Sequence, residues 1–292
     1  MADNPSISIA PESISLEALK EQRGKRLTQF PWWFLTMILI AIWAAYSIYT
    51  RENYRAAFEF IKAGLGVTII TSLISYGIAL LLGLLAGLGR ISGNVLFNNL
   101  ATLYIELVRG IPMLVLIFFI ALVGVPIAVD GMNSLGAWLN TLGLTALGGI
   151  LTSFTNQAVA MNVRAIIALA ITYGAFLAEI FRAGIQSIGR GQMEAARSLG
   201  MSYGQAMRHI ILPQAIRNVL PALGNDFVAM VKDSSLVSVL AVRDITQVAR
   251  LYAGSTFRFR EAYITLSVLY LTMTVALSLV VQFVERRLRR HE

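Results

Sequence analysis

Long apolar runs separated by polar stretches dominate the chain. Six of these runs approach or exceed the length of about 20 residues that a helix needs to cross a bilayer. Their predicted limits are residues 31–49, 64–89, 111–129, 165–181, 218–241 and 262–284. The pattern therefore predicts an all-α integral membrane protein with about six transmembrane helices.

Composition supports this prediction. Of the 292 residues, 57% are hydrophobic and only 14% are charged, whereas soluble domains carry about 25% charged residues. Most of the chain thus lacks the polar surface that contact with water requires. The chain contains no cysteine, which excludes disulfides, thiolate nucleophiles and cysteine-based metal sites.

The net charge of +8 would suggest nucleic-acid binding in a soluble protein. In a membrane protein, Lys and Arg instead set the topology and contact anionic lipid headgroups, so we expect membrane lipid and not nucleic acid as their partner. Basic residues concentrate in the polar tail 1–30, in the loop 186–217 and in the last residues of the chain. This distribution predicts that the N- and C-termini are both cytoplasmic, and the first thirty residues are predicted to be a tail and not a signal peptide.

The loop 186–217 carries an ordered set of acidic, small and proline residues, namely Glu194, Ala195, Ala196, Gly200, Ile210, Leu212 and Pro213. The spacing predicts two short helices around a turn. Glu194 is expected in the first turn of the first helix, where a carboxylate suits the positive helix end, and Gly200 supplies a permissive backbone after it. Residues 203–211 are expected to form the second helix, with Pro213 ending it. A compact helix pair of this kind is suited to docking by another protein. The alternative is a pair of amphipathic helices on the membrane surface.

The pattern of Glu-Ala-Ala, three residues, Gly, nine residues and Ile-x-Leu-Pro resembles the cytoplasmic coupling motif of ABC importer permeases. Further stretches resemble the branch of this family that takes up polar amino acids: residues 66–92, 104–120, 168–227 and 231–242. The resemblance implies the type I ABC importer permease fold, with a minimal core of five spans. It divides the chain into a cytoplasmic tail at 1–30, an extra helix and external segment at 31–63, and the permease domain at 64–292. The extra segment and the long external loop 130–163 depart from the family pattern.

The resemblance also implies a function and a set of partners. The chain is expected to pair with a second copy or a paralogue in the bacterial inner membrane and to contact ABC ATPase subunits through residues 194–213. An extracytoplasmic binding protein would deliver a polar amino acid. The chain has no Gly-x-x-x-x-Gly-Lys-Ser/Thr loop, so we expect ATP to be bound by the ATPase and expect no cofactor in this chain. With His209 and His291 as its only histidines, we predict no catalytic or metal site and no enzymatic activity of its own.

Ionisable residues at membrane depth are costly and usually face a partner or a wet cavity. The candidates for a substrate path are Glu179 and Asp233, followed by Asp226 and Glu106. The alternative is a structural role, such as an ion pair between Lys232 and Asp226 or Glu106. The pattern Gly83-x-x-x-Gly87 permits close approach of another helix, as in a dimer seam, although small residues are common in membrane spans generally.

Two other classes of function remain open at this point. A secondary transporter would show paired broken helices in inverted repeats, and a membrane enzyme would need a catalytic constellation at one interface; neither pattern is visible. The acidic candidates suggest a basic amino acid as substrate, although one carboxylate could equally hold the ammonium group of a zwitterion. The sequence does not identify the substrate or distinguish a homodimer from a heterodimer.

Overall fold

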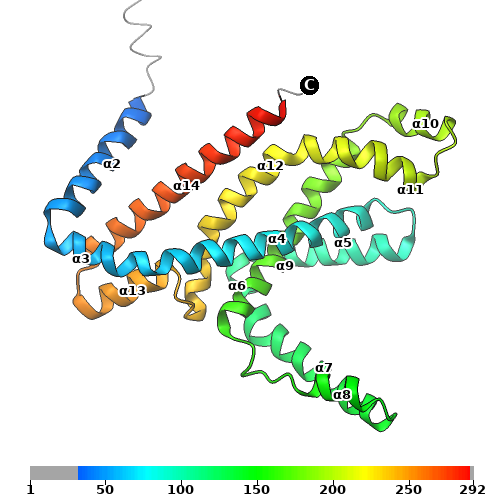
Figure 1. The fold of residues 1–292 in the computed structure, drawn as a ribbon, viewed down its shortest axis with the longest axis horizontal. Helices are drawn as coiled ribbons and strands as arrows, with labels where there is room; N and C mark the ends of the chain where they lie inside the picture. The colour runs from blue at the N-terminus through cyan, green and yellow to red at the C-terminus, as the bar shows by residue number, and fades with distance from the viewer. Residues whose placement is uncertain (1–31, 290–292) are drawn as a thin grey trace, which may run out of the picture.

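The computed structural model describes residues 32–289, and within that range the chain forms helices and turns without a strand (Figure 1). The predicted tail at 1–30 lies outside the described residues. The α-helices are α2 (Trp32–Thr50), α3 (Glu52–Ile61), α4 (Leu65–Arg90), α5 (Val95–Gly110), α6 (Met113–Phe119), α7 (Val125–Thr141), α8 (Thr145–Thr152), α9 (Met161–Gln186), α10 (Arg190–Ser198), α11 (Tyr203–Ala206), α12 (Leu212–Asp233), α13 (Ile245–Thr256) and α14 (Phe259–Arg289). Short 3-10 helices at Lys62–Gly64 and Ser234–Leu240 and π-helical turns at Ile120–Gly124 and Met207–Ile211 join some of them.

Four helical stretches in the described part of the chain are long and apolar enough to cross a membrane: Glu52–Arg90, Met113–Thr141, Met161–Gln186 and Phe259–Arg287. The apolar stretch of α2, Leu35–Thr50, is shorter. The predicted fifth span corresponds to α12, which polar and charged residues make less apolar than these four. Its crossing of the membrane stays a prediction.

The predicted third span ends too early. The helix continues from α6 through the π-helical turn at Ile120–Gly124 into α7, which reaches Thr141 instead of residue 129. Pro126 does not interrupt it, because the π-helical turn directly before it alters the backbone pairing at this point of the helix. Part of the predicted loop 130–163 is therefore helical, and it also contains the short helix α8. Figure 1 shows α7 and α8 as a hairpin that projects from the other helices.

The predicted fifth span is helical over a different range. The α-helix begins at Leu212, ends at Asp233 and gives way to a 3-10 helix over Ser234–Leu240. The hydroxyl of Ser234 donates to the carbonyl oxygen of Val231 at 2.8 Å, and such local side-chain bonds compete with regular helix formation. Ala241 then adopts a left-handed conformation with φ of 58°, which turns the chain toward α13.

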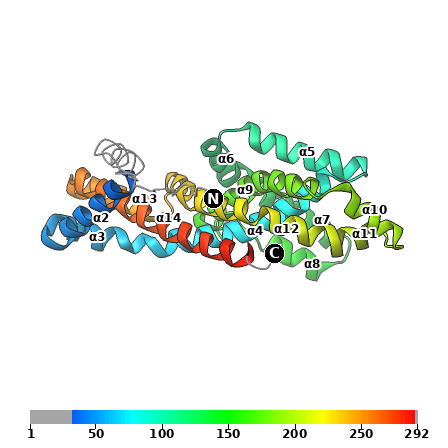
Figure 2. The ribbon, with the colours of Figure 1, turned by 90° about the horizontal axis from the view of Figure 1, so that it is seen from above.

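Helix α5 was not predicted as an element. It begins after Asn94, whose side chain accepts a hydrogen bond from the Leu96 N–H at 2.9 Å, as favourable N-cap residues do. Asn98 in its first turn donates to the carbonyl oxygen of Arg90 at 2.5 Å. These bonds fold α5 back beside α4 (Figures 1 and 2), and the segment between the second and third predicted spans is thus a helix.

The most extensive helix packing joins α4 and α9. A Cβ atom added to Gly83 would lie 2.7 Å from the Leu177 Cβ, and one added to Gly87 would lie 2.8 Å from the carbonyl oxygen of Ala178. The two glycines therefore allow the backbones of one subunit to approach each other, as small residues do at membrane helix interfaces. The Gly-x-x-x-Gly pattern thus forms a seam within the chain.

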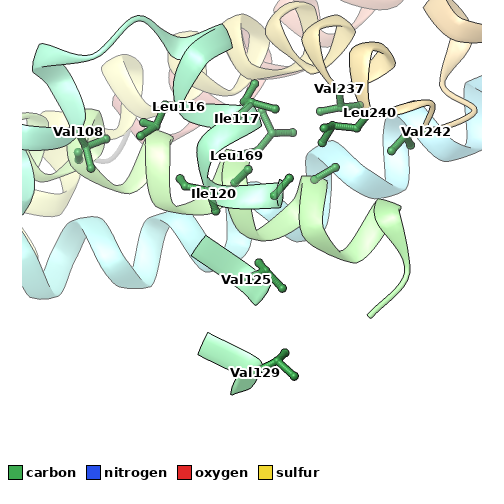
Figure 3. Close-up of a cluster of buried hydrophobic side chains, with 14 residues drawn as sticks. Val108, Leu116, Ile117, Ile120, Val125, Val129, Leu169, Val237, Leu240 and Val242 are labelled. Atoms are coloured by element: carbon green, nitrogen blue, oxygen red, sulfur yellow. The ribbon is translucent and has the colours of Figure 1, made fainter. Parts of the chain in front are cut away.

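A buried apolar cluster lies beside this seam. Figure 3 shows Leu116, Ile117 and Ile120 beside Leu169 of α9, with Val237 nearby. Through this cluster, α6, the π-helical turn that follows it and the 3-10 helix after α12 pack against α9. Helix α9 is thereby the central element of the subunit.

Candidate coupling site and translocation path

The segment from α10 to α11, which we call the knob (residues 190–211), lies at one end of the helix bundle, beyond the ends of α9 and α12 (Figures 1 and 2). Helix α10 ends in a Schellman motif. The Met201 N–H donates to the carbonyl oxygen of Ala196 at 3.2 Å, and the Gly200 N–H donates to that of Arg197 at 3.0 Å. Gly200 has φ of +82°, the left-handed conformation that this motif requires. The predicted permissive backbone at Gly200 is confirmed.

Helix α11 begins directly after this turn with a capping box. The Gln205 N–H donates to the Ser202 hydroxyl at 3.3 Å, and the Ser202 N–H donates to the Gln205 side-chain oxygen at 2.8 Å. Reciprocal bonds of this kind satisfy two backbone donors that would otherwise be unpaired. The end of one helix and the start of the next are therefore both fixed by hydrogen bonds, and the knob has a defined shape.

The knob has a buried side and an exposed side. Ala196 and Ala206 are buried, and Ile211 packs with Ile185 at the end of α9. The other side exposes an apolar tip formed by Leu199, whose surface is 84% accessible, and Tyr203, which is 53% accessible. Large apolar residues that remain this exposed beside polar neighbours are typical of interaction sites.

The residues of the predicted motif are distributed over both sides. Glu194 and Ala195 are exposed near the apolar tip, whereas Ala196 is buried. Ile210 and Leu212 are partly buried in the packing between the knob and α9. The predicted motif included neither Leu199 nor Tyr203. The signal available for both was their position on either side of the Gly200 turn.

Two details of the predicted knob are wrong. Glu194 lies in the second turn of α10, because the helix already begins at Arg190. Pro213 does not end the second helix, since the π-helical turn Met207–Ile211 leads directly into α12. Pro213 is in the first turn of α12, and a π-type turn alters the backbone pairing of the preceding residues. Helix α11, the π-helical turn and α12 are consequently one continuous helical path.

Glu106 and Glu179, two of the four candidate path residues, meet at one arginine. The Arg90 guanidinium, at the end of α4, pairs with Glu179 of α9 and with Glu106 of α5, the latter at 2.6 Å. Glu179 also binds Arg182, one turn further along α9, at 2.8 Å. Glu106 thus pairs with Arg90 and not with Lys232, which had been one structural alternative. The cluster joins three helices by charge-assisted hydrogen bonds.

Asp233, at the end of α12, has a different partner. Its Oδ2 accepts a hydrogen bond from the Tyr173 hydroxyl of α9 at 2.6 Å. Asp226 lies two turns earlier on α12 and is partly buried, next to Phe227, whose ring is 4.9 Å from that of Tyr76. The structure therefore connects Asp233 to α9 through a tyrosine and places Glu106 and Glu179 in a separate ion-pair cluster.

The comparisons with known proteins agree with this architecture. Residues 79–290 match the family described as "Binding-protein-dependent transport system inner membrane component". The chain belongs to this family. The permease is 40% identical over 223 residues to the probable glutamine ABC transporter permease protein GlnM of Bacillus subtilis, covering 76% of this chain and 90% of that protein. It is 31% identical over 226 residues to the glutamine transport system permease protein GlnP of Escherichia coli, covering 77% and 91%.

Solved structures show the same fold. A chain from the crystal structure of an amino acid ABC transporter with histidines is 36% identical, with a TM-score of 0.63 and coverage of 78% of this permease and 94% of that chain. A chain of the MetNI methionine ABC transporter is 18% identical with a TM-score of 0.52, which supports the fold alone. The predicted family, the all-α fold class of the type I permeases and the role as a transporter membrane subunit instead of an enzyme are confirmed.

Proposed function

We propose that this permease imports a polar amino acid, delivered by an extracytoplasmic binding protein, in an assembly of two permease and two ABC ATPase subunits. The observation that carries the proposal is the structure of the knob. Hydrogen bonds fix the turn between its two helices, and its second helix continues into α12. Leu199 and Tyr203 form an exposed apolar tip. ATP is bound and hydrolysed by the ATPase, and the termini and the knob lie on the cytoplasmic side.

In this proposal the ATPase binds the exposed side of the knob. Tyr203 supplies aromatic contact area of the kind enriched at the centres of protein interfaces, and Leu199 adds exposed apolar area beside it. Glu194 is exposed as well and adds a negative charge to the surface of the knob. Closure of the two ATPases on ATP then displaces the knobs and favours one of two conformations of the membrane helices.

The charges of the candidate path favour a neutral polar substrate over a cationic one. Glu179 already binds two arginines, and Glu106 shares one of them. The carboxylates of this cluster are therefore compensated within the protein, and a cationic side chain would have to displace an arginine. The names of two relatives, which specify glutamine, support glutamine as the first substrate to test. Asp233 remains the candidate for contact with the ammonium group of the substrate.

The test is reconstitution of the permease with its ATPase and binding protein in lipid nanodiscs. We expect ATP hydrolysis that rises when the binding protein carries glutamine, and no hydrolysis by the permease alone. A double variant, Leu199→Ser with Tyr203→Ser, should lose ATPase association while remaining membrane-inserted. The matched control is Arg208→Ser, an exposed residue of the knob that is not part of the apolar tip. Amino-acid uptake by the permease without ATPase or ATP would refute the proposal.

A further inference from the structure

The extra N-terminal helix α2 touches the rest of the permease along only a small part of its length. Among residues 35–50, only Ala44 and Ser47 are buried. Its C-terminal end is joined to α3, which is anchored on α13 and α14 through buried Ala57 and Ile61. From this junction α2 and α14 diverge toward the other end of α14, as Figure 1 shows.

An apolar groove lies between the two diverging helices. Its volume is about 360 Å³, and its lining is almost entirely apolar. From α2 it is lined by Met37, Ile38, Ile40 and Ala41, and from α14 by Val268, Leu271, Thr272, Val275, Ala276 and Leu279. Water gains no polar partners on such a surface, so within a bilayer the groove requires an apolar occupant.

A basic residue follows the groove on the same face of α14. Thr272, Leu279 and Arg286 are spaced by seven residues and therefore point in nearly the same direction on a helix. Arg286 is exposed, and so is Arg287, but Arg287 points about 100° away. Fourteen residues separate Thr272 from Arg286, about 21 Å of helix, which is close to half the full thickness of a bilayer including headgroups.

We propose that the α2–α14 groove is a binding site for an anionic phospholipid, whose acyl chain fills the groove and whose phosphate binds Arg286. The order of the surface, apolar at mid-membrane and basic at the membrane boundary, matches the order of acyl chain and headgroup in one leaflet. Basic residues beside a gap between transmembrane helices commonly bind anionic headgroups. The lipid would complete the contact between the extra helix and the permease domain, which the protein side chains leave open.

Retention of lipid by the purified permease–ATPase complex tests this site. The complex is equilibrated in detergent with equal amounts of phosphatidylglycerol and phosphatidylcholine, and bound lipid is measured by native mass spectrometry. We expect selective retention of phosphatidylglycerol. Arg286→Gln should weaken it about fivefold, the factor that corresponds to about 1 kcal/mol per basic residue near anionic lipid, whereas Arg287→Gln should have a smaller effect.

The groove itself is tested by filling it. Ala41→Trp places a large side chain in the groove and should abolish retention, while the control Leu39→Trp, at a similar depth on an exposed position outside the groove lining, should not. Equal retention of both lipids by the wild type, or equal retention by the two tryptophan variants, would overturn the proposal. Because the chain has no cysteine, Ala41→Cys also shows whether a second copy covers the groove: cross-linking between copies at this position would overturn the lipid site.

Discussion

The knob offers a perturbation whose cost can be traced to one backbone angle. Gly200 has φ of +82°, and a Cβ atom at this position would meet no other atom within 4 Å. Replacing it with alanine therefore adds no steric clash and removes no side-chain contact. The only penalty is that of holding a residue with a Cβ in the left-handed conformation, which the Schellman motif of α10 demands.

The magnitude of this penalty is about 1–2 kcal/mol. If the ATPase binds only the native turn, destabilising that turn reduces the fraction of competent knobs and weakens the apparent affinity in proportion. A change of 1–2 kcal/mol corresponds to a factor of roughly 5–30. We therefore expect Gly200→Ala to weaken ATPase binding by up to this factor and Gly200→Val to weaken it further. Gly200→Asn should recover part of the affinity, because asparagine tolerates positive φ better than other residues.

Gly204 provides the matched control in the same knob. A Cβ atom there would also meet nothing within 4 Å, and its φ is not left-handed, so Gly204→Ala should bind the ATPase as the wild type does. The measurement is the dissociation constant of the ATPase for the permease in nanodiscs, together with uptake by the reconstituted complex. Equal affinities for Gly200→Ala and Gly204→Ala would show that the shape of this turn does not govern coupling, and the role proposed for the knob would then be wrong.

Three further predictions concern the membrane helices. Gly83→Ala should destabilise the permease by about 1–3 kcal/mol, the usual cost of overpacking. The control Gly77→Ala lies on the same helix, where an added Cβ meets no atom within 4 Å, and should leave stability unchanged. Thermal unfolding in detergent measures both variants. Asp233→Asn should reduce uptake about ten- to hundredfold if its charge holds the substrate ammonium group, with a smaller loss for Tyr173→Phe; equal losses would indicate a purely structural bond. Glu179→Gln should weaken the contact with its two arginines and lower the thermal stability of the permease. An unchanged unfolding temperature would contradict a stabilising role for the ion-pair cluster.

The fold class was predictable because it rests on apolar runs, and membrane helices need such runs irrespective of tertiary contacts. The motif at residues 194–213 was predictable for a different reason, since Gly200 is required by a local backbone angle. The helix limit at Pro213 was not predictable in the same way. Pro213 was predicted to end a helix, but it follows a π-helical turn and lies in the first turn of α12.

The partners of the charged residues could not be predicted from spacing. Residues on one helix share a face by periodicity, but the pairing of Glu106 and Glu179 with Arg90 depends on the packing of three helices. The same limitation applies to Gly83, whose pattern indicates close approach without indicating which helix approaches. Helix α5 was missed because its exposed apolar residues alternate with polar ones and do not form a continuous run.

The position of α9 explains how a displacement of the knob would reach the membrane helices in the proposed mechanism. At the end of α9 beside the knob, Ile185 packs against Ile211 of the knob, and further along, Leu177 packs against the glycine seam of α4. Between and beyond these contacts it carries Glu179 and Tyr173, which bind charged residues of α4 and α12. Because close-packed contacts resist compression and transmit displacement, a pull on the knob that leaves α9 in place would have to break a buried apolar contact. The knob, α12 and α9 would therefore move together, and the carboxylates of the candidate path would move with them.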